Sequence, residues 1–337
     1  MIRQAIAKLV TGESLSENEA AGAMLSIMSG EATAAQIGAY LAALRMKGET
    51  VDEIVGMVRV MRDHARRVEI EGTLLDTCGT GGDERGTFNV STAAAFIAAG
   101  AGARVAKHGN RAMTSRCGSA DVLEALGAKI DLEPEQVLRC VEEVGVGFLF
   151  AQAFHPAMKH AAGPRRELGI RTVFNVLGPL CNPAGVDRQV LGVADPVLGE
   201  KLIHALQRLG SKHALVVHGQ DGIDEMSVSA PTTVFELREG RVFRDTLLPS
   251  EAGLETHRLE DVRGGSPEEN AARLRTLLAG EPGPLRDFAL LNAAAGLLAY
   301  DLVPTLREGV RVAARAIDSG AALEKLERFV EVTNRFA

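Results

Sequence analysis

The chain has 337 residues, of which 46% are apolar and 24% charged, a composition typical of a globular protein with a buried core. Its net charge of −7, with 4% aromatic residues and no Trp, argues against a surface built to bind nucleic acid. The longest apolar run, between Thr92 and Arg104, is shorter than the roughly 18 residues that a membrane span requires. The first residues show no signal-peptide pattern, and we expect a cytoplasmic protein with neither a nucleic-acid nor a membrane partner.

The first seventy residues carry repeated helix-start signals. Ser16 with Glu19, Thr33 with Gln36 and Thr50 with Glu53 fit the spacing of a capping box, in which side chains satisfy the free backbone N–H groups of a helix start. Between these signals, apolar residues recur at near-helical spacing, and Gly30 and Gly48 stand where glycines end helices. This part of the chain is predicted to be a small all-α unit.

After Gly72 short apolar runs alternate with polar loops and helices. The runs at 74–75 and 104–106 lead into the loops CGTGGD and KHGNR and then into helices, and the run at 214–217 ends in HGQDGIDE. This alternation predicts an α/β domain with a mainly parallel central sheet, whose ligand sites lie beyond the carboxyl ends of the strands. We therefore expect the three loops to converge on one cleft. TTVFELREGRVFRD, nearer the C-terminus, predicts an antiparallel hairpin that turns at Glu239-Gly240.

The first loop combines glycines with polar side chains. Glycines bring backbone N–H groups close to an anion, and the helix expected near Ser91 adds free N–H donors and a partial positive charge. Asn89 and Thr92 add side-chain donors at the same helix start. The spacing is neither the dinucleotide fingerprint, because Glu84 replaces its third glycine, nor a Walker A loop, because no lysine follows Gly86. Alone, the loop is equally well explained as a glycine-rich turn before a helix.

The second loop, KHGNR, places two fixed cations, Lys107 and Arg111, at a predicted strand end, followed by Ser115 and by Ser119 at the next helix start. Such a loop suits a ligand with several phosphate groups. By itself it would more often be a solvated basic turn. Two such loops at consecutive strand ends favour a phosphate site.

The third loop contains the adjacent carboxylates Asp224 and Glu225. Such a pair is usually a solvated turn, but beyond a strand end and facing a polyphosphate it suits Mg²⁺, which proteins bind through one or two carboxylates plus phosphate oxygens. Elsewhere, His155-Pro156 and Arg165-Arg166 flank a predicted short helix; a core histidine and helix-end charges are the ordinary interpretation of these residues.

Taken together, the strings GTGGD, NVST, KHGNR with the following GSADVLEALG, RxxLGIRT, N-LGPLxNP and GxDE closely resemble those of the anthranilate phosphoribosyltransferases. They occur in order along nearly the whole chain, and their combination is highly specific. Ala112 and Cys117 stand where this family more often carries serine, which bears on secondary contacts only.

The resemblance implies a fold shared with the pyrimidine nucleoside phosphorylases. Residues 1–70 and a segment near 165–185 would form a helical domain that pairs in a homodimer, and residues 71–164 and 186–337 would form the α/β domain. The expected activity joins anthranilate to phosphoribosyl pyrophosphate (PRPP) with the help of Mg²⁺.

The resemblance also implies roles for individual residues. PRPP would be held by Gly79, Gly82, Asp83, Thr87, Asn89, Val90, Ser91, Thr92, Lys107, His108, Gly109, Asn110, Arg111, Ser115 and Ser119. Anthranilate would be held by Gly79, His108, Asn110, His155, Arg165 and Pro179. Mg²⁺ would be held by Ser91, Asp224 and Glu225. The candidate catalytic residues are Lys107, Asp83 and Arg165. The planar fork of N–H donors on Arg165 suits a carboxylate.

Two alternative functions remain from the sequence. A pyrimidine nucleoside phosphorylase would use the same fold, but the KHGNR loop and the pair of carboxylates argue against it. A non-catalytic relative that binds nucleic acid would need a basic surface, which a pI near 5.7 does not favour. The sequence indicates no residue that accepts the proton released by the amine.

Overall fold

The computed structural model describes residues 1–112 and 116–336, so the predicted contact of Ser115 lies outside the described residues. Up to residue 70 the N-terminal region contains helices joined by loops and no strand, as predicted, and its last helix ends at Asp63. Its helices are α1 Ile2–Leu9, α2 Glu17–Met28, α3 Ala34–Lys47 and α4 Val51–Asp63. All three predicted capping boxes form, and in each the cap hydroxyl accepts the N–H three residues later at 3.3 Å. Gly30 and Gly48, with φ of 76° and 83°, end α2 and α3.

One sheet forms the centre of the described molecule, with the strand order β3-β2-β1-β4-β5-β6-β7. The first five strands in this order are mutually parallel, and β6 and β7 are antiparallel additions. The strands are β1 Leu75–Gly79, β2 Val105–Gly109, β3 Val146–Phe150, β4 Arg188–Gly192, β5 His213–Gly219, β6 Thr232–Arg238 and β7 Arg241–Leu247. The prediction of a mainly parallel sheet is thus confirmed.

The hairpin of β6 and β7 turns at Glu239-Gly240, as the sequence predicted. Both turn residues have positive φ, 51° and 73°, and Arg238 pairs with Arg241 across the turn. Two positive φ values are typical of a two-residue turn whose twist matches that of the strands, and glycine at the second position fits it without strain.

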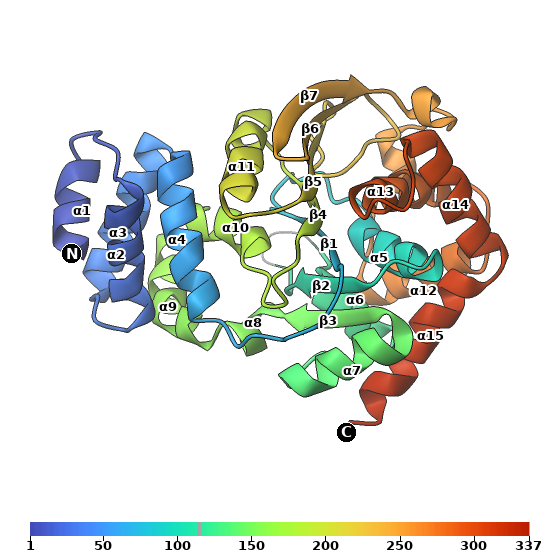
Figure 1. Cartoon of the computed structure of the whole chain (residues 1–337), viewed down its shortest axis with the longest axis horizontal. Helices are drawn as coiled ribbons and strands as arrows, with labels where there is room; N and C mark the ends of the chain where they lie inside the picture. The colour runs from blue at the N-terminus through green and yellow to red at the C-terminus, as the bar shows by residue number, and fades with distance from the viewer. Residues whose placement is uncertain (113–115, 337) are drawn as a thin grey trace.

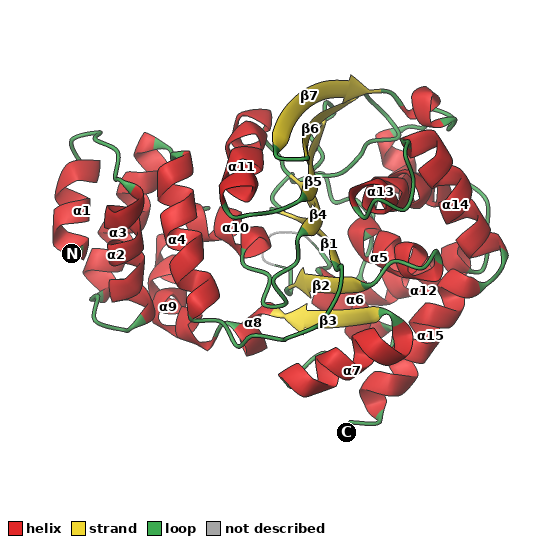
Figure 2. Cartoon of the chain, in the orientation of Figure 1, coloured by secondary structure: helices red, strands yellow, loops and turns green. Residues whose placement is uncertain are grey.

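Two groups of helices cover the sheet, and Figure 2 shows the strands between them. Successive strand residues point to opposite faces, so each strand feeds two cores. On β5, Leu215 and Val217 join the core shared with α5 (Val90–Gly100) and α13 (Pro284–Ala299), whereas Ala214 and Val216 join the core shared with α2–α4 and α11 (Pro196–Arg208). The helices of the α/β region are α5 Val90–Gly100, α6 Ser119–Ala125, α7 Pro134–Val144, α8 Ala151–Phe154, α11 Pro196–Arg208, α12 Pro267–Leu278, α13 Pro284–Ala299, α14 Leu306–Asp318 and α15 Ala321–Asn334, with short 3-10 turns η3 Pro249–Ala252 and η4 Leu259–Val262.

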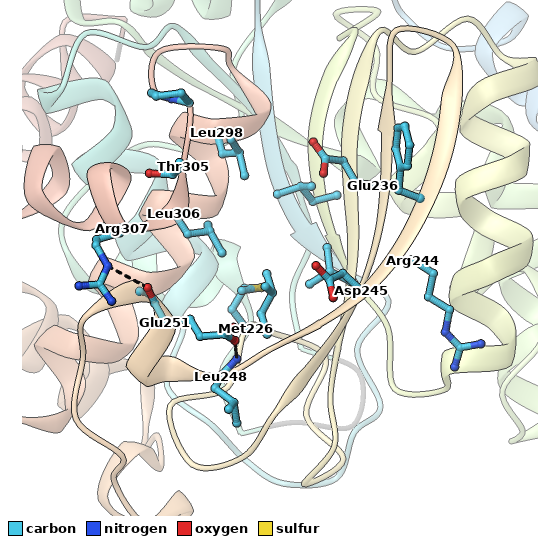
Figure 3. A pocket seen from close by; sticks show the side chains of 16 residues that line it. Met226, Glu236, Arg244, Asp245, Leu248, Glu251, Leu298, Thr305, Leu306 and Arg307 are labelled. Carbon is cyan, nitrogen blue, oxygen red and sulfur yellow. Dashed lines mark hydrogen bonds between the residues drawn. The ribbon is translucent and has the colours of Figure 1, made fainter.

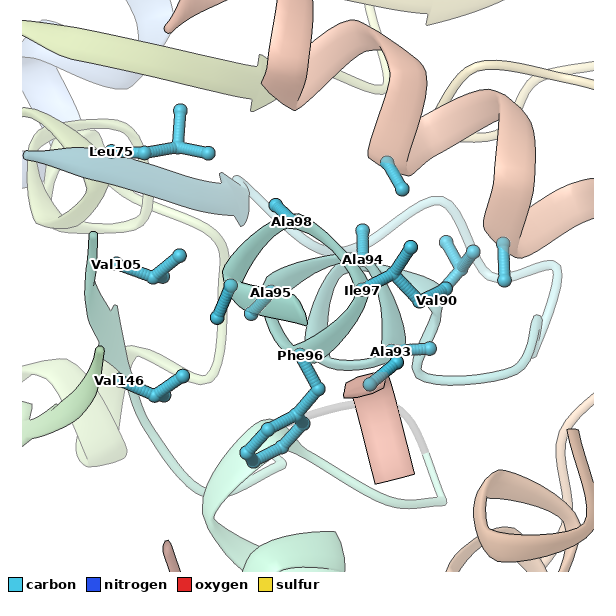
Figure 4. Packing of buried hydrophobic residues seen from close by; sticks show 14 of the residues in the cluster. Leu75, Val90, Ala93, Ala94, Ala95, Phe96, Ile97, Ala98, Val105 and Val146 are labelled. Atoms are coloured by element: carbon cyan, nitrogen blue, oxygen red, sulfur yellow. The ribbon is translucent and has the colours of Figure 1, made fainter. Parts of the chain in front are cut away.

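Helix α5 is the centre of the first core. It is almost entirely buried and rich in alanine, and Leu75, Val105 and Val146 from three neighbouring strands face it (Figure 4). Small side chains allow α13 and α15 to approach closely; a Cβ on Gly100 would lie only 2.8 Å from the backbone nitrogen of Ala322. This packing holds α5, which follows the first glycine-rich loop, in the core of the α/β domain.

The segment 156–180 lies against the N-terminal helices. It contains η1 Pro156–Met158, α9 Lys159–Leu168, α10 Val173–Leu177 and η2 Gly178–Leu180. Helix α9 packs on α2 and α3, and Val173 and Phe174 of α10 belong to the same core as those helices (Figure 1). The sequence predicts a short helix that ends before Arg165, but the helix is longer. It continues through Pro164 to Leu168 and is capped by Gly169, where φ is +62°.

Candidate active site

The first and third loops meet because Asp224 lies across the ends of β1 and β4. Its Oδ2 atom accepts the N–H of Gly81 at 2.8 Å. A Cβ on Gly79 would lie 2.5 Å from that same oxygen, and a Cβ on Gly192 would lie 1.6 Å from the carbonyl oxygen of Asp224. Only glycine at both strand ends admits this close approach, so the predicted convergence of these loops is present in the structure.

Three carboxylates lie close together at this point. Burial, together with Asp83, raises the pKa of Asp224 to about 6. Burial and Asp224 raise the pKa of Glu225 well above its usual range, and burial raises the pKa of Asp83, whose Oδ2 atom is buried without a partner in the described residues. Clustered carboxylates that repel one another favour a cation between them.

These carboxylates fit Mg²⁺ only as part of a larger shell. Across residues 1–112 and 116–336, no group of three or more His, Cys, Asp or Glu side chains is arranged to hold a metal ion by itself. Mg²⁺ characteristically takes one or two carboxylates and completes its shell with water and substrate phosphates. Asp224 and Glu225 supply that number of ligands, so the arrangement fits a metal that arrives with a phosphorylated substrate.

Lys107 connects the second loop to the first. Its side chain is buried, and its Nζ atom donates to the carbonyl oxygen of Thr77 and, at 3.2 Å, to Oγ of Ser91 at the start of α5. Burial lowers the pKa of Lys107, whereas Asp76 and Glu225 act in the opposite direction. The ammonium group is therefore held at the end of β1, in electrostatic contact with the carboxylate cluster.

A buried polar network lies beneath Lys107, and the sequence did not reveal it. Asp76 is fully buried; its carboxylate accepts the N–H of His108 at 3.2 Å and the side-chain amide of Asn182 at 2.9 Å. Gln189 donates to it at 3.4 Å. Burial raises the pKa of Asp76 to about 6, and Lys107 opposes that shift. An acidic residue within the apolar run that becomes β1 was the available signal, because a buried carboxylate needs a cation and hydrogen bonds.

His108 and His155 lie side by side next to η2. Their ring centroids are 5.1 Å apart, and both rings are buried. His108 Nδ1 lies 3.2 Å from the carbonyl oxygen of Gly178, next to Pro179, and His155 hydrogen-bonds the backbone of Cys181. Burial lowers the pKa of His108 to about 3 and that of His155 to about 4. Both rings are therefore neutral at pH 7, and their Nε2 atoms have no partner in the described residues.

These lowered pKa values predict how stability depends on pH. Below the unfolded-state pKa of 6.5, a histidine takes up a proton in the unfolded chain but not in the folded one, so stability is lost as the pH falls from about 6.5 toward 4. For His108 the loss at pH 5 is about 2 kcal/mol. In urea unfolding at pH 7.5 and pH 5, His108→Asn should show a smaller pH effect than the wild type by about this amount. If the free energy of unfolding changed by the same amount between the two pH values in both proteins, the lowered pKa of His108 would be contradicted.

Arg165 lies on α9, and its guanidinium group lies 5.2 Å from the centre of the Phe174 ring. Burial lowers the pKa of Arg165, so its charge lies in a partly desolvated environment.

The side chain of Arg111 points toward helix α6. It forms ion pairs with Asp121 and Glu124 of α6, and its predicted contact with PRPP stays a prediction.

The remaining predicted residues surround the first two loops. Asn89 is tied on both sides, since it donates to the carbonyl oxygen of Cys117 at 2.9 Å and accepts from Asn270 at 2.8 Å. Ser119 donates to the carbonyl oxygen of Asn110 at 3.4 Å. The others are Gly82 and Thr87 in the first loop, the buried Val90 and Thr92 in α5, and Gly109 at the end of β2. Ala112, one of the departures from the family pattern, donates its N–H to Asp121.

A separate pocket of about 700 Å³ opens between the β6–β7 hairpin and α14 (Figure 3). Apolar side chains from both sides line it, including Leu215, Val234, Phe243 and Leu306. None of the predicted site residues lines this pocket, so the candidate site is defined by the convergence of the loops and not by this hollow.

Comparison with known proteins agrees with this geometry. Residues 3–65 match the helical bundle domain of the glycosyl transferase family, and residues 71–323 match its a/b domain. These two matches together define a two-domain glycosyl transferase. The chain is 57% identical to the anthranilate phosphoribosyltransferase of Symbiobacterium thermophilum over 97% of its length and 96% of the relative, and 54% identical to that of Dehalococcoides mccartyi over 100% and 99%.

Solved structures show the same likeness. The crystal structure of anthranilate phosphoribosyltransferase from Thermus thermophilus is 48% identical and superimposes with a TM-score of 0.93, covering 98% of this chain and 99% of that one. The Saccharomyces cerevisiae enzyme in complex with PRPP and Mg is 32% identical, with a TM-score of 0.91 and coverage of 99% and 98%. The chain belongs to the anthranilate phosphoribosyltransferase family. These relatives decide against the nucleoside phosphorylase and nucleic-acid-binding alternatives.

Proposed function

We propose that the chain transfers the 5-phosphoribosyl group of PRPP to the amine of anthranilate, giving N-(5-phosphoribosyl)anthranilate and pyrophosphate in tryptophan biosynthesis. The observation that carries the proposal is the convergence of the three loops at the carboxyl ends of the strands. The carboxylates of Asp224 and Glu225 and the ammonium group of Lys107 gather there, opposite two neutral histidines. The charged side chains suit the phosphate groups of PRPP and their Mg²⁺, and the buried histidine rings suit a flat aromatic amine.

The phosphate side would be formed by the first two loops and the start of α5. Backbone N–H groups around Gly79 and Gly82, with Ser91 and Thr92, would donate to phosphate oxygens. Lys107 is already oriented by its bonds to Thr77 and Ser91. Asp224, Glu225 and Ser91 would hold Mg²⁺, which supplies positive charge to the phosphate groups when bound.

In the reaction, a bond forms between the amine nitrogen and the anomeric carbon of the ribose, the bond from that carbon to pyrophosphate breaks, and the nitrogen then releases one proton. The difficult part is departure of pyrophosphate, because it leaves an electron-poor sugar. Lys107 and the loop N–H groups lower this barrier, since they face the oxygens on which negative charge grows. The aromatic amine is neutral at pH 7, so attack needs no prior removal of a proton.

The anthranilate side would lie between the histidine pair and Arg165. The unpartnered Nε2 atoms of His108 and His155 are acceptors in the neutral rings, and they suit the N–H groups of an aromatic amine. Arg165 suits the carboxylate. Anthranilate held in this way would present its nitrogen to the sugar. This placement of the two reactants would increase the rate of the reaction.

One assay tests the proposed function directly. Purified protein should abolish anthranilate fluorescence in the presence of PRPP and Mg²⁺, and the loss should stop when either PRPP or Mg²⁺ is left out. A parallel measurement of pyrophosphate release should match the anthranilate consumed, one for one. Pyrophosphate release that is independent of anthranilate would contradict the assigned acceptor.

We also propose that the protein is a homodimer that pairs through a helical domain made of residues 1–70 and the segment near 165–185. Four large apolar side chains within the first 50 residues are exposed: Met1 by 69%, Val10 by 67%, Leu25 by 43% and Met46 by 89%. A dimer interface would bury such groups. Sedimentation at micromolar concentration should give about twice the chain mass of 35.7 kDa. A single monomeric species at that concentration would refute the dimer.

The cysteines bear on the compartment in which the protein acts. All four cysteines are free and buried, as expected for reduced thiols, and this supports the proposed cytoplasmic location. Over the described residues, no helix has both the length and the apolar character needed to cross a membrane.

A further inference from the structure

Arg171 reaches the first loop from the helical segment 156–180. It stands in the linker between α9 and α10, a segment that packs against α2–α4, and it belongs to the string LGIRT, in which the sequence assigns it no role. Its Nη2 atom donates to the carbonyl oxygen of Thr80 at 3.2 Å. Its Nη1 atom lies directly over Gly82, where a Cβ would be only 1.4 Å away. The guanidinium group therefore lies on the glycine-rich loop proposed to bind pyrophosphate.

The surroundings of this guanidinium group leave most of its hydrogen-bonding capacity unused. Arginine carries five N–H donors, and the bond to Thr80 is the only one that Arg171 makes within residues 1–112 and 116–336. Asp224, Asp83 and Glu84 attract its charge and Arg45 repels it, but none of the three carboxylates forms an ion pair with it in the described residues. The side chain is half-buried, and burial lowers its pKa. A partly desolvated fork of donors over an anion-binding loop is suited to a phosphate group.

We propose that Arg171 binds the pyrophosphate group of PRPP, with Nη2 on Thr80 and its remaining donors on phosphate oxygens. The proposal rests on the proposed function and adds a residue to it. Arg165 lies six residues earlier in the same segment, so the helical side would contact both substrates, anthranilate through Arg165 and pyrophosphate through Arg171. Because pyrophosphate gains charge as it leaves, Arg171 would stabilise the transition state more than the bound substrate.

The alternative is a purely structural bond that holds the loop to the helical side. Arg171→Gln separates the two roles, since its side-chain amide can still donate to Thr80 but carries no charge. Arg171→Lys keeps the charge but loses the planar fork. Arg166→Ala is the matched control, because Arg166 is an exposed arginine of the same segment that has no place in the site.

Calorimetric binding of pyrophosphate in the presence of Mg²⁺ gives the first readout and needs no turnover. We expect Arg171→Gln and Arg171→Ala to weaken this binding roughly ten- to a hundred-fold, the effect of losing a charge-assisted hydrogen bond. Arg171→Lys should lie between these variants and the wild type, and Arg166→Ala should bind as the wild type does. Pyrophosphate affinity of Arg171→Gln equal to that of the wild type would overturn the proposal.

Kinetics give the second readout. We expect kcat to fall and the KM for PRPP to rise in Arg171→Gln, while the KM for anthranilate stays within about twofold. Guanidinium ion at millimolar concentration should restore part of the activity of Arg171→Ala but not that of Lys107→Ala. Equal effects on both substrates, or no rescue, would favour the structural role. A wild-type protein that binds pyrophosphate through Arg171 but does not consume anthranilate would refute the proposed function and leave this inference standing.

Discussion

The double variant Asp224→Asn, Glu225→Gln should fold normally and lose about a hundred-fold or more of its turnover at a Mg²⁺ concentration that saturates the wild type. Its amides keep the size of the carboxyl groups but remove the charge that would hold Mg²⁺. A Mg²⁺ titration of activity, with calorimetric binding of PRPP at each concentration, measures the effect. Unchanged activity across that titration would show that the pair does not hold the metal.

The stability of the same variant should move in the opposite direction. Burial raises the pKa of both carboxyl groups, so keeping them ionised at pH 7 costs the folded state free energy. Neutral amides remove that cost, and the melting temperature should equal or exceed that of the wild type. Asp221→Asn is the matched control; Asp221 belongs to the same loop, where it accepts from Ser227 Oγ at 2.7 Å, and its replacement should leave the Mg²⁺ titration unchanged.

The sequence was sufficient for the elements that short-range rules decide. The capping boxes at Ser16, Thr33 and Thr50 form where the three-residue spacing predicts them. The hairpin turns at Glu239-Gly240 because a two-residue turn of this kind needs a positive φ at both positions, and glycine adopts it readily. Loops at the ends of parallel strands also met as expected, because parallel strands present their carboxyl ends at one edge of the sheet.

The residues that the sequence did not reveal are those whose role depends on distant partners. The role of Asp76 depends on Asn182 and Gln189, whose side chains donate to its carboxylate. Both lie more than a hundred residues away in the sequence. Arg171 lies over Gly82 because the helical segment folds back on the first loop. No local spacing predicts either contact. Conversely, the basic pair Arg165-Arg166 predicts a helix end too early, because packing of α9 on α3 extends the helix to Leu168.

The two sides of the cleft should respond to different substitutions. Arg165→Ala removes the proposed partner of the anthranilate carboxylate, and the KM for anthranilate should rise roughly ten- to a hundred-fold while the KM for PRPP barely changes. Lys107→Ala should instead raise the KM for PRPP and lower kcat, because its partner gains charge in the transition state. Steady-state kinetics with each substrate varied in turn measures both effects. Equal changes in both KM values for both variants would show that the cleft is not divided in this way.

A loss of stability would mimic such a kinetic effect for Lys107, so the experiment needs a matched pair of variants. Lys107→Ala removes the nearby positive charge that lowers the pKa of the buried Asp76 carboxylate, so we expect the variant to be less stable than the wild type. The double variant Asp76→Asn, Lys107→Met removes both charges and keeps the packing, so it should recover most of the lost stability. It should still turn over as slowly as Lys107→Ala, because the ammonium group that faces pyrophosphate is absent from both. Recovery of activity together with stability would mean that Lys107 serves the fold and not the reaction.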